Sequence, residues 1–145
     1  IIILLLMHKK LKSASRQKDL ETKHTRKKLV VSEGISTNSQ KVVFSFENFG
    51  EKSHGLDCDS EEFKNLIRHL KTLSKMSWQQ VQESDRHKLG SEEINVSEIR
   101  ENVPTSKDKV LSFRYSGMKP FIGERKNQVL DIYYIDPAFD LYDHD

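Results

Sequence analysis

The chain has 145 residues, of which 35 % are hydrophobic and 32 % are charged, and its formal net charge is +2. This length is typical of one compact domain with some additional tail. Cys58 is the only cysteine, which excludes an internal disulfide and a cysteine-rich zinc site. Because nothing in the chain needs an oxidising compartment, we expect a cytoplasmic protein.

The first six residues, IIILLL, are apolar but far fewer than the roughly 20 that a membrane helix needs. They also precede a basic run instead of following one, which is the wrong order for a secretory signal. We therefore expect no contact with a membrane, and we expect Met7 to be the natural start of the chain.

Charge is distributed unevenly along the chain. Residues 1–41 carry ten basic and three acidic side chains, a net +7, and the remainder carries 14 and 19, a net −5. Residues 1–40 are polar with weak apolar periodicity, so we expect a basic arm that is mostly disordered or partly helical, followed by a compact domain at 41–145. Lys27 and Lys28 are expected to contact nucleic acid, although this charge also suits an acidic protein partner or no specific ligand.

The first part of the domain is predicted to be a strand followed by a helix. Residues 41–49 alternate as a half-buried strand does, with one side formed by Val42, Phe44 and Phe46. Asp59 is the expected N-cap of the helix, and Glu62 would complete a capping box. Apolar residues then recur at helical spacing, at Phe63, Leu66, Ile67, Leu70 and Leu73.

A second helix is predicted over residues 77–88. Ser77 and Gln80 have the spacing of a capping box, and Gly90 is a natural stop. We expect Trp78 and Val81 to anchor this helix to the sheet, and His87 to lie in its last turn, where the negative end of the helix dipole suits it. Residues 91–108 are interpreted as a short helix or an irregular connection.

Three strands are predicted to complete the fold, at residues 109–117, 119–125 and 128–136. In the first of them, alternation points two sets to opposite faces: Leu111, Phe113 and Tyr115 on one, Ser112 and Arg114 on the other. The predicted order is one strand, two helices and a three-strand meander. This order favours an α+β fold of two layers, an antiparallel sheet with helices on one face.

This order resembles the RelE/ParE superfamily of small bacterial toxins. The C-terminal part is also similar to small uncharacterised bacterial and phage-associated proteins, through Arg114, Gly117, Pro120, Ile122, Gly123, Arg125, Asp136, Pro137, Leu141 and Tyr142. The superfamily resemblance implies an endoribonuclease that cuts messenger RNA at the ribosome and is neutralised by a cognate antitoxin. It also implies catalytic roles for Arg114, Arg125, Tyr142 and His144, although the terminal order here is Tyr-Asp-His instead of His-Tyr.

Those four residue types suit metal-independent RNA cleavage. Histidine transfers protons near neutral pH, and the arginine fork binds phosphate oxygens. The set works only if the tail folds back over the sheet. The alternative is that both arginines lie at sheet edges for solubility, while Tyr142 packs and His144 frays.

Four cations on the first helix form a second candidate surface. Lys64, Arg68, Lys71 and Lys75 recur on one face, which either follows a phosphate backbone or is simply solvated. Two alternative functions therefore stay open. One is a non-catalytic nucleic-acid or protein binding module of a mobile element, and the other is a structural protein of such an element with no nucleic-acid contact.

We expect no metal and no other cofactor. The loop residues His54, Asp57, Cys58 and Asp59 include one thiol and do not form a recognisable site. The C-terminal aspartates are spaced too loosely for a calcium loop, and most of them are interpreted as solubilising: Asp131, Asp136, Asp140, Asp143 and Asp145.

Overall fold

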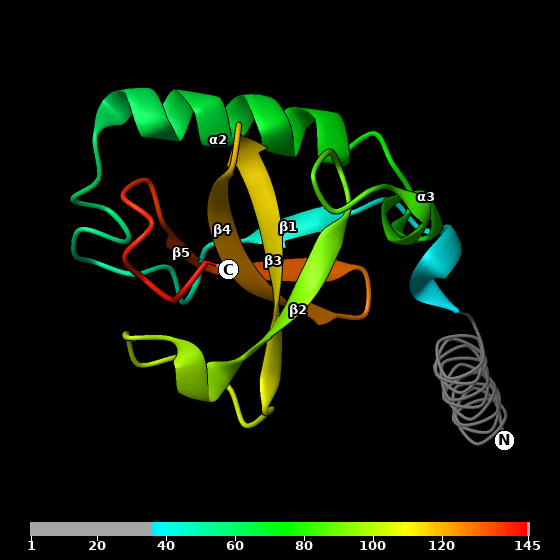
Figure 1. The fold of residues 1–145 in the computed structure, drawn as a ribbon. Helices are drawn as coiled ribbons and strands as arrows, with labels where there is room; N and C mark the ends of the chain where they lie inside the picture. The colour runs from blue at the N-terminus through cyan, green and yellow to red at the C-terminus, as the bar shows by residue number, and fades with distance from the viewer. Residues whose placement is uncertain (1–35, 145) are drawn as a thin grey trace, which may run out of the picture. The chain divides into compact units, whose positions relative to one another are not determined.

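The computed structural model describes residues 36–144, and every structural statement below concerns those residues. Their fold is α+β, with one five-stranded mixed sheet and two α-helices (Figure 1). The compact unit spans Thr37–Asp145. Most of the arm expected at 1–40 lies outside the described residues. Within 36–144, no helix is long and apolar enough to cross a bilayer.

The elements follow one another in the order η1 (Thr37–Ser39), β1 (Val43–Ser45), α2 (Ser60–Leu73), α3 (Trp78–Glu83), β2 (Ser91–Asn95), η2 (Val96–Glu98), β3 (Lys109–Ser116), β4 (Lys119–Lys126) and β5 (Val129–Ile135). Across the sheet the strand order is β1-β5-β4-β3-β2. The last four strands in sequence pair antiparallel, whereas β1 pairs parallel with β5. The expectation of a purely antiparallel sheet is therefore wrong, because the two helices return the chain to β2 at the far edge, and β1 is left beside β5.

Strand β2 was not expected, because residues 91–108 were interpreted as a helix or an irregular connection. Its sequence, SEEIN, has a single large apolar residue, Ile94, and glutamate is a poor strand former. The strand exists because β3 offers it an open edge: Glu92 pairs with Ser112 and Ile94 with Val110. Backbone pairing on a sheet edge leaves little trace in the sequence.

Helix α2 begins where the sequence predicts. The Asp59 side chain accepts a hydrogen bond from the backbone N–H of Glu61. The predicted capping box is wrong, however, because the Glu62 carboxylate turns to the sheet and accepts hydrogen bonds from Lys119 and Tyr115, at 2.5 and 2.6 Å. Two stronger donors from the sheet replace the N-cap backbone N–H as its partners.

Helix α3 has the predicted capping box between Ser77 and Gln80. It ends at Glu83, well before Gly90, because Ser84 is extended and its hydroxyl donates to the Gln80 carbonyl. His87 therefore lies in a turn beyond the helix, and the helix-dipole interpretation of this histidine is wrong.

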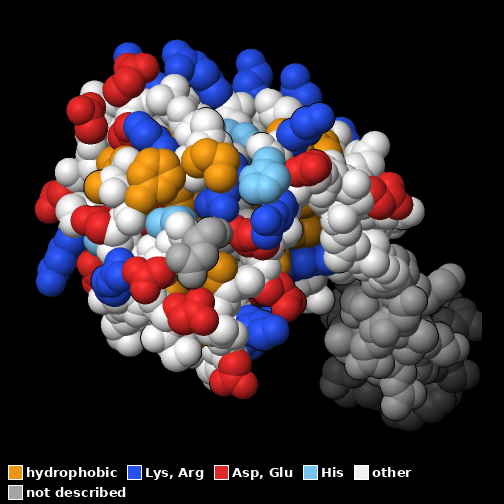
Figure 2. All heavy atoms as spheres, viewed as in Figure 1, with side chains coloured by type: hydrophobic (Ala, Val, Ile, Leu, Met, Phe, Trp, Pro, Cys, Tyr) orange, Lys and Arg blue, Asp and Glu red, His pale blue; other side chains and the backbone are white. Residues whose placement is uncertain are grey.

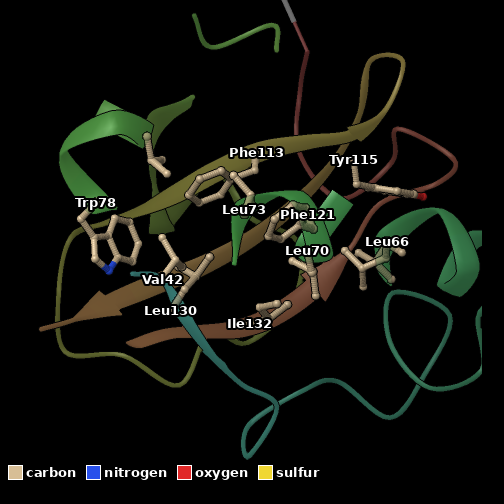
Figure 3. Packing of buried hydrophobic residues seen from close by; sticks show 12 residues of the cluster. Val42, Leu66, Leu70, Leu73, Trp78, Phe113, Tyr115, Phe121, Leu130 and Ile132 are labelled. Carbon is tan, nitrogen blue, oxygen red and sulfur yellow. The ribbon is translucent and has the colours of Figure 1, made fainter. Parts of the chain in front are cut away.

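One face of the sheet is covered by α2 and α3. The residues packed there, which we call the helix-side core, are Val42, Leu66, Leu70, Leu73, Trp78, Val81, Phe113, Tyr115, Phe121, Leu130, Ile132 and Ile135 (Figure 3). Phe113 and Phe121 stack with ring centroids 5.1 Å apart. Trp78 and Val81 are each 1 % exposed, which confirms that they anchor α3. Ile67 departs from the predicted apolar stripe and is 55 % exposed.

The other face of the sheet is covered by the segment after η2 and by the chain's C-terminal tail. The residues packed there, which we call the tail-side core, are Ile99, Val103, Val110, Ile122, Tyr133, Leu141 and Tyr142. Leu141 is fully buried, and the N–H of Arg100 donates to its carbonyl at 2.9 Å. The tail therefore folds back over the sheet, and the expectation that His144 frays while Tyr142 packs is met only for Tyr142.

Candidate functional site

Tyr142 and His144, the pair singled out at the end of the sequence, lie together on the tail-side face. Their ring centroids are 4.1 Å apart. The Tyr142 hydroxyl is hydrogen-bonded to the Ser112 hydroxyl at 2.7 Å, and His144 Nε2 lies 3.0 Å from Asp136 Oδ2. Burial raises the pKa of Tyr142, and this outweighs the opposing effects of Ser112 and Arg114. The tyrosine is therefore a neutral, buried phenol.

Arg114 lies beside this pair. It is near enough to Tyr142 for its positive charge to oppose the rise in the tyrosine's pKa. Its Nη2 donates to Glu92 Oε1 at 2.8 Å, and its Nη1 is buried without a hydrogen-bond partner among the described residues. Glu92 neutralises the guanidinium, so a phosphate would have to displace this carboxylate to bind it.

Arg125 does not join the other three predicted catalytic residues. It points to the helix side, where its guanidinium lies 4.3 Å from the Trp78 ring and donates to Thr37 and Asn38. Arg114 points to the opposite face and pairs in register with Pro120, five residues or about 16 Å along β4 from Arg125. The expectation that both guanidinium groups share one pocket with Tyr142 and His144 is therefore wrong.

A second histidine lies near the same tail. His54 Nε2 is 2.6 Å from Asp140 Oδ1 and 3.9 Å from Asp136 Oδ1, and His54 Nδ1 is 3.2 Å from Glu101 Oε1. Burial opposes protonation of this imidazole, but the hydrogen bonds to Asp140 and Glu101 prevail and raise the pKa of His54. The imidazoles of His54 and His144 thus lie on either side of the buried Asp136 carboxylate.

Sequence reasoning missed this His54 cluster. It grouped His54 with its neighbours in the loop, whereas the structure joins it to residues more than 40 positions away. The Ile135 N–H donates to the His54 carbonyl, which docks the loop beside the end of β5. The one local signal near this cluster is Asp136-Pro137, which marks the end of β5. The solubility interpretation is wrong for Asp131 and Asp136, which are 3 % and 0 % exposed.

The predicted basic face of α2 is present on the surface. The Lys64 and Arg68 side chains are 66 % and 69 % exposed, and Lys71 is exposed as well. Figure 2 shows Lys and Arg side chains gathered along the part of the surface that α2 forms. Lys75 lies two residues beyond the end of α2, and so extends the face into the following turn. We call these four residues the α2 basic face.

The remaining predicted nucleic-acid contacts, Lys27 and Lys28, lie outside the described residues. Comparisons with known proteins give no further guidance, since no protein-family model, curated protein or solved structure matches this chain. The function must therefore be argued from the geometry of these two surfaces.

Proposed function

We propose that this protein binds RNA through the α2 basic face. The observation that carries the proposal is a solvent-exposed row of cations with almost no compensating charge. Of the acidic residues on α2, only Glu61 approaches the row, 3.7 Å from Lys64 and 4.0 Å from Arg68. Glu62 is turned to Lys119 on the sheet. Such a surface gains free energy by releasing the counterions of a phosphate backbone.

An apolar side chain lies among these cations. Ile67 is exposed and, with Phe63, Lys64 and Arg68, lines a shallow depression on the helix. Cations on both sides of an apolar contact suit a nucleotide, whose phosphate and base need different partners. This feature favours a single strand, whose bases are accessible to an apolar side chain, over a duplex that presents only its backbone.

The test is the salt dependence of RNA binding by the full chain. For single strands, each phosphate contact contributes about −0.7 to the slope of log K against log salt concentration. The double variant Lys71→Gln/Lys75→Gln removes two contacts, so its slope should be shallower by about 1.4. The matched control, Lys88→Gln/Lys109→Gln, removes the same charge from exposed positions on other parts of the domain.

Equal changes of slope in the two double variants would contradict the proposal, because they would reflect net charge alone. Unchanged binding in both would place the contact elsewhere. Binding of duplex DNA with the same affinity and the same variant response would argue for a general polyanion surface instead of an RNA-binding one.

A second candidate function is endoribonuclease activity, which the resemblance to RelE-like toxins implies. The specific observation in its favour is the packing of Tyr142 against His144 beside Arg114, with Asp136 orienting the imidazole. In such a reaction the 2′-hydroxyl attacks the adjacent phosphorus and loses its proton to a base, while the departing 5′-oxygen gains one. His144 is the residue suited to these transfers, and Arg114 to the phosphate.

This activity is tested by incubating the full chain with messenger RNA and with translating ribosomes. His144→Gln and Arg114→Gln should each abolish cleavage, whereas Arg125→Gln, on the opposite face, should leave it unchanged. The absence of cleavage by the unmodified chain, together with normal growth of cells that express it, would remove the enzymatic proposal. RNA binding through α2 would then remain as a non-catalytic function.

The RelE/ParE-like fold and a cognate antitoxin belong to the same proposal. Such partners often lay a helix over the toxin, and the exposed Ile67 among cations suits an acidic amphipathic helix. Co-expression with the product of the neighbouring reading frame, followed by co-purification, tests this. An Ile67→Asp variant should then lose the partner, because a buried carboxylate would oppose docking.

A further inference from the structure

We propose that His54, Asp136 and Asp140 bind a divalent transition-metal ion of the Zn²⁺ type. One donor atom from each residue lies within 4.8 Å of the other two. The three come from the loop after β1, the end of β5 and the C-terminal tail, and the tertiary fold alone brings them together. This inference goes beyond RNA binding, since it concerns a different surface and a different ligand.

The donor set determines the class of ion. It combines one imidazole nitrogen with two carboxylate oxygens, whereas Mg²⁺ and Ca²⁺ are bound almost entirely by oxygen. Three protein ligands of mixed nitrogen and oxygen type, with a further position open to solvent, are typical of accessible Zn²⁺ sites. A Zn²⁺-type ion therefore fits His54 and its two carboxylates better than a hard cation does.

Asp136 has an oxygen available for such an ion. Its Oδ2 accepts from the Leu141 N–H and lies 3.0 Å from His144, so both of its lone-pair directions are used. Its Oδ1 accepts only from the Asp140 N–H among the described donors and faces His54 at 3.9 Å. These backbone hydrogen bonds fix a fully buried carboxylate, and so one ligand is preorganised.

The spacing requires only a small adjustment. Ligand atoms about 2.1 Å from a tetrahedral ion lie about 3.4 Å apart. Asp136 Oδ1 is slightly farther than that from His54 Nε2, and Asp140 Oδ1, at 2.6 Å, is closer. The Asp140 side chain is 64 % exposed and free to retract. The ion replaces the proton that bridges His54 and Asp140, and that proton is released to solvent.

Glu101 has the position of a supporting carboxylate. It holds the far nitrogen of His54, Nδ1, at 3.2 Å, which leaves Nε2 directed at Asp140 and Asp136. Metal-binding histidines commonly have such a carboxylate on their other nitrogen, where it fixes the tautomer and raises ligand basicity. Glu101 is therefore a positioning residue and not a ligand.

Access and charge are both suitable for a cation. The Asp140 side chain is 64 % exposed, so the donor set has one side open to solvent, and the recess that His54 and Glu101 line is adjacent to the set. Three carboxylates, from Glu101, Asp136 and Asp140, surround one imidazole. The nearby Arg100 is paired with Asp143 and the Asp140 carbonyl, so it does not neutralise the three carboxylates. A divalent ion would offset their repulsion.

The test is titration of the full chain, free of any affinity tag, with Zn²⁺ in a calorimeter, followed by Mg²⁺ and by Co²⁺. We expect one Zn²⁺ per chain, release of a proton, and at least tenfold weaker binding in His54→Ala and in Asp140→Asn. The matched control Asp57→Asn removes an exposed carboxylate from the same loop as His54, outside the set, and should bind Zn²⁺ normally. Circular dichroism establishes that each variant is folded.

Glu101→Gln tests the positioning role. Loss of such supporting groups typically weakens binding by about 10- to 100-fold. We also expect Co²⁺ to give the visible absorption of a four- or five-coordinate site in the unmodified chain. In Glu101→Gln this spectrum should change shape, a response that a purely structural role would not produce.

The proposal is overturned if Zn²⁺ does not bind, or if His54→Ala and Asp140→Asn bind it normally, since other histidines would then be responsible. It is also overturned if Asp57→Asn loses binding equally, or if Mg²⁺ binds as tightly as Zn²⁺. The variant Lys71→Gln/Lys75→Gln should keep full Zn²⁺ affinity. Failure of RNA binding and failure of metal binding are therefore distinguished by separate residues and separate measurements.

Discussion

The two faces of the sheet are stabilised in different ways. The helix-side core is built from aliphatic and aromatic side chains, with Phe121 stacked on Phe113 at its centre. The tail-side face buries polar groups as well: Ser112, Glu124 and Asp136 all lie there, each with hydrogen-bond partners. Polar groups are tolerated in a core only where partners satisfy them. The face with these networks is accordingly the one that carries the candidate chemistry.

The proposed sites also lie on different faces of the sheet. The α2 basic face lies on the outer surface of the helix whose inner surface forms the helix-side core. The proposed metal site at His54 and the Tyr142–His144 pair both depend on the tail lying against the opposite face. Mutations that disturb one core should therefore leave ligand binding at the other surface unchanged, as long as the domain remains folded.

The largest expected effect is at the centre of the helix-side core. Phe121→Ala removes a ring that is fully buried, and it should lower the free energy of unfolding by about 3–5 kcal/mol. Urea denaturation measures this, with Met118→Ala as the control, because Met118 is 51 % exposed and its loss should change stability by only about 0.5 kcal/mol. Similar effects in the two variants would mean that Phe121 is not packed as described.

The next largest effect is on the tail. Leu141→Ala leaves a cavity in the tail-side core and should cost about 2–5 kcal/mol, because this side chain is fully buried. If the tail frayed in solution, the loss in urea denaturation would instead be close to zero. In the folded variant the His144 ring should lose its contact with Tyr142, which the chemical shifts of the imidazole would report.

A smaller effect is expected at the buried hydroxyl pair. Tyr142→Phe leaves the Ser112 hydroxyl buried without its partner, which should cost about 1–3 kcal/mol. The double variant Ser112→Ala/Tyr142→Phe removes both partners, so it should recover most of that loss. A double-mutant cycle by thermal unfolding measures the coupling, and strictly additive losses would show that the two hydroxyls do not interact.

The smallest effect depends on pH. Burial alone would raise the pKa of Glu62, but hydrogen bonds from Lys119 and Tyr115 prevail and lower it. The Glu62 carboxylate therefore stabilises the fold above its unfolded pKa, about 4.3, and this stabilisation is lost as pH falls through the lower folded value. Glu62→Gln should be less stable than the unmodified chain at neutral pH, and the difference should shrink in acid. A difference that grows on acidification would reverse the assigned sign.

Much of the helix-side fold could be predicted from the sequence. Asp59 marks the start of α2, the Ser77–Gln80 spacing marks α3, and alternation in β3 assigns Phe113 and Arg114 to opposite faces correctly. These features are local, because capping and side-chain alternation depend on residues a few positions apart. Three of the four residues predicted to share a pocket, Arg114, Tyr142 and His144, also lie together.

The sequence could not predict contacts that join distant segments. Arg125 appeared equivalent to Arg114, yet the strand pairing sends it to Trp78 on the other face. Strand β2 has almost no signal of its own, and Glu62 exchanged its predicted local partner for Lys119. In each case a long-range partner was available only after the sheet had formed.

The sequence by itself determined the two helices, the strands other than β2, and which helix carries the cations, because caps, periodicity and charge spacing act within a few residues. Only the tertiary structure decided that His54 meets Asp136 and Asp140, and that the tail becomes part of a core. The physical reason is that these contacts depend on strand register and loop docking, which place side chains from opposite ends of the domain within hydrogen-bonding distance.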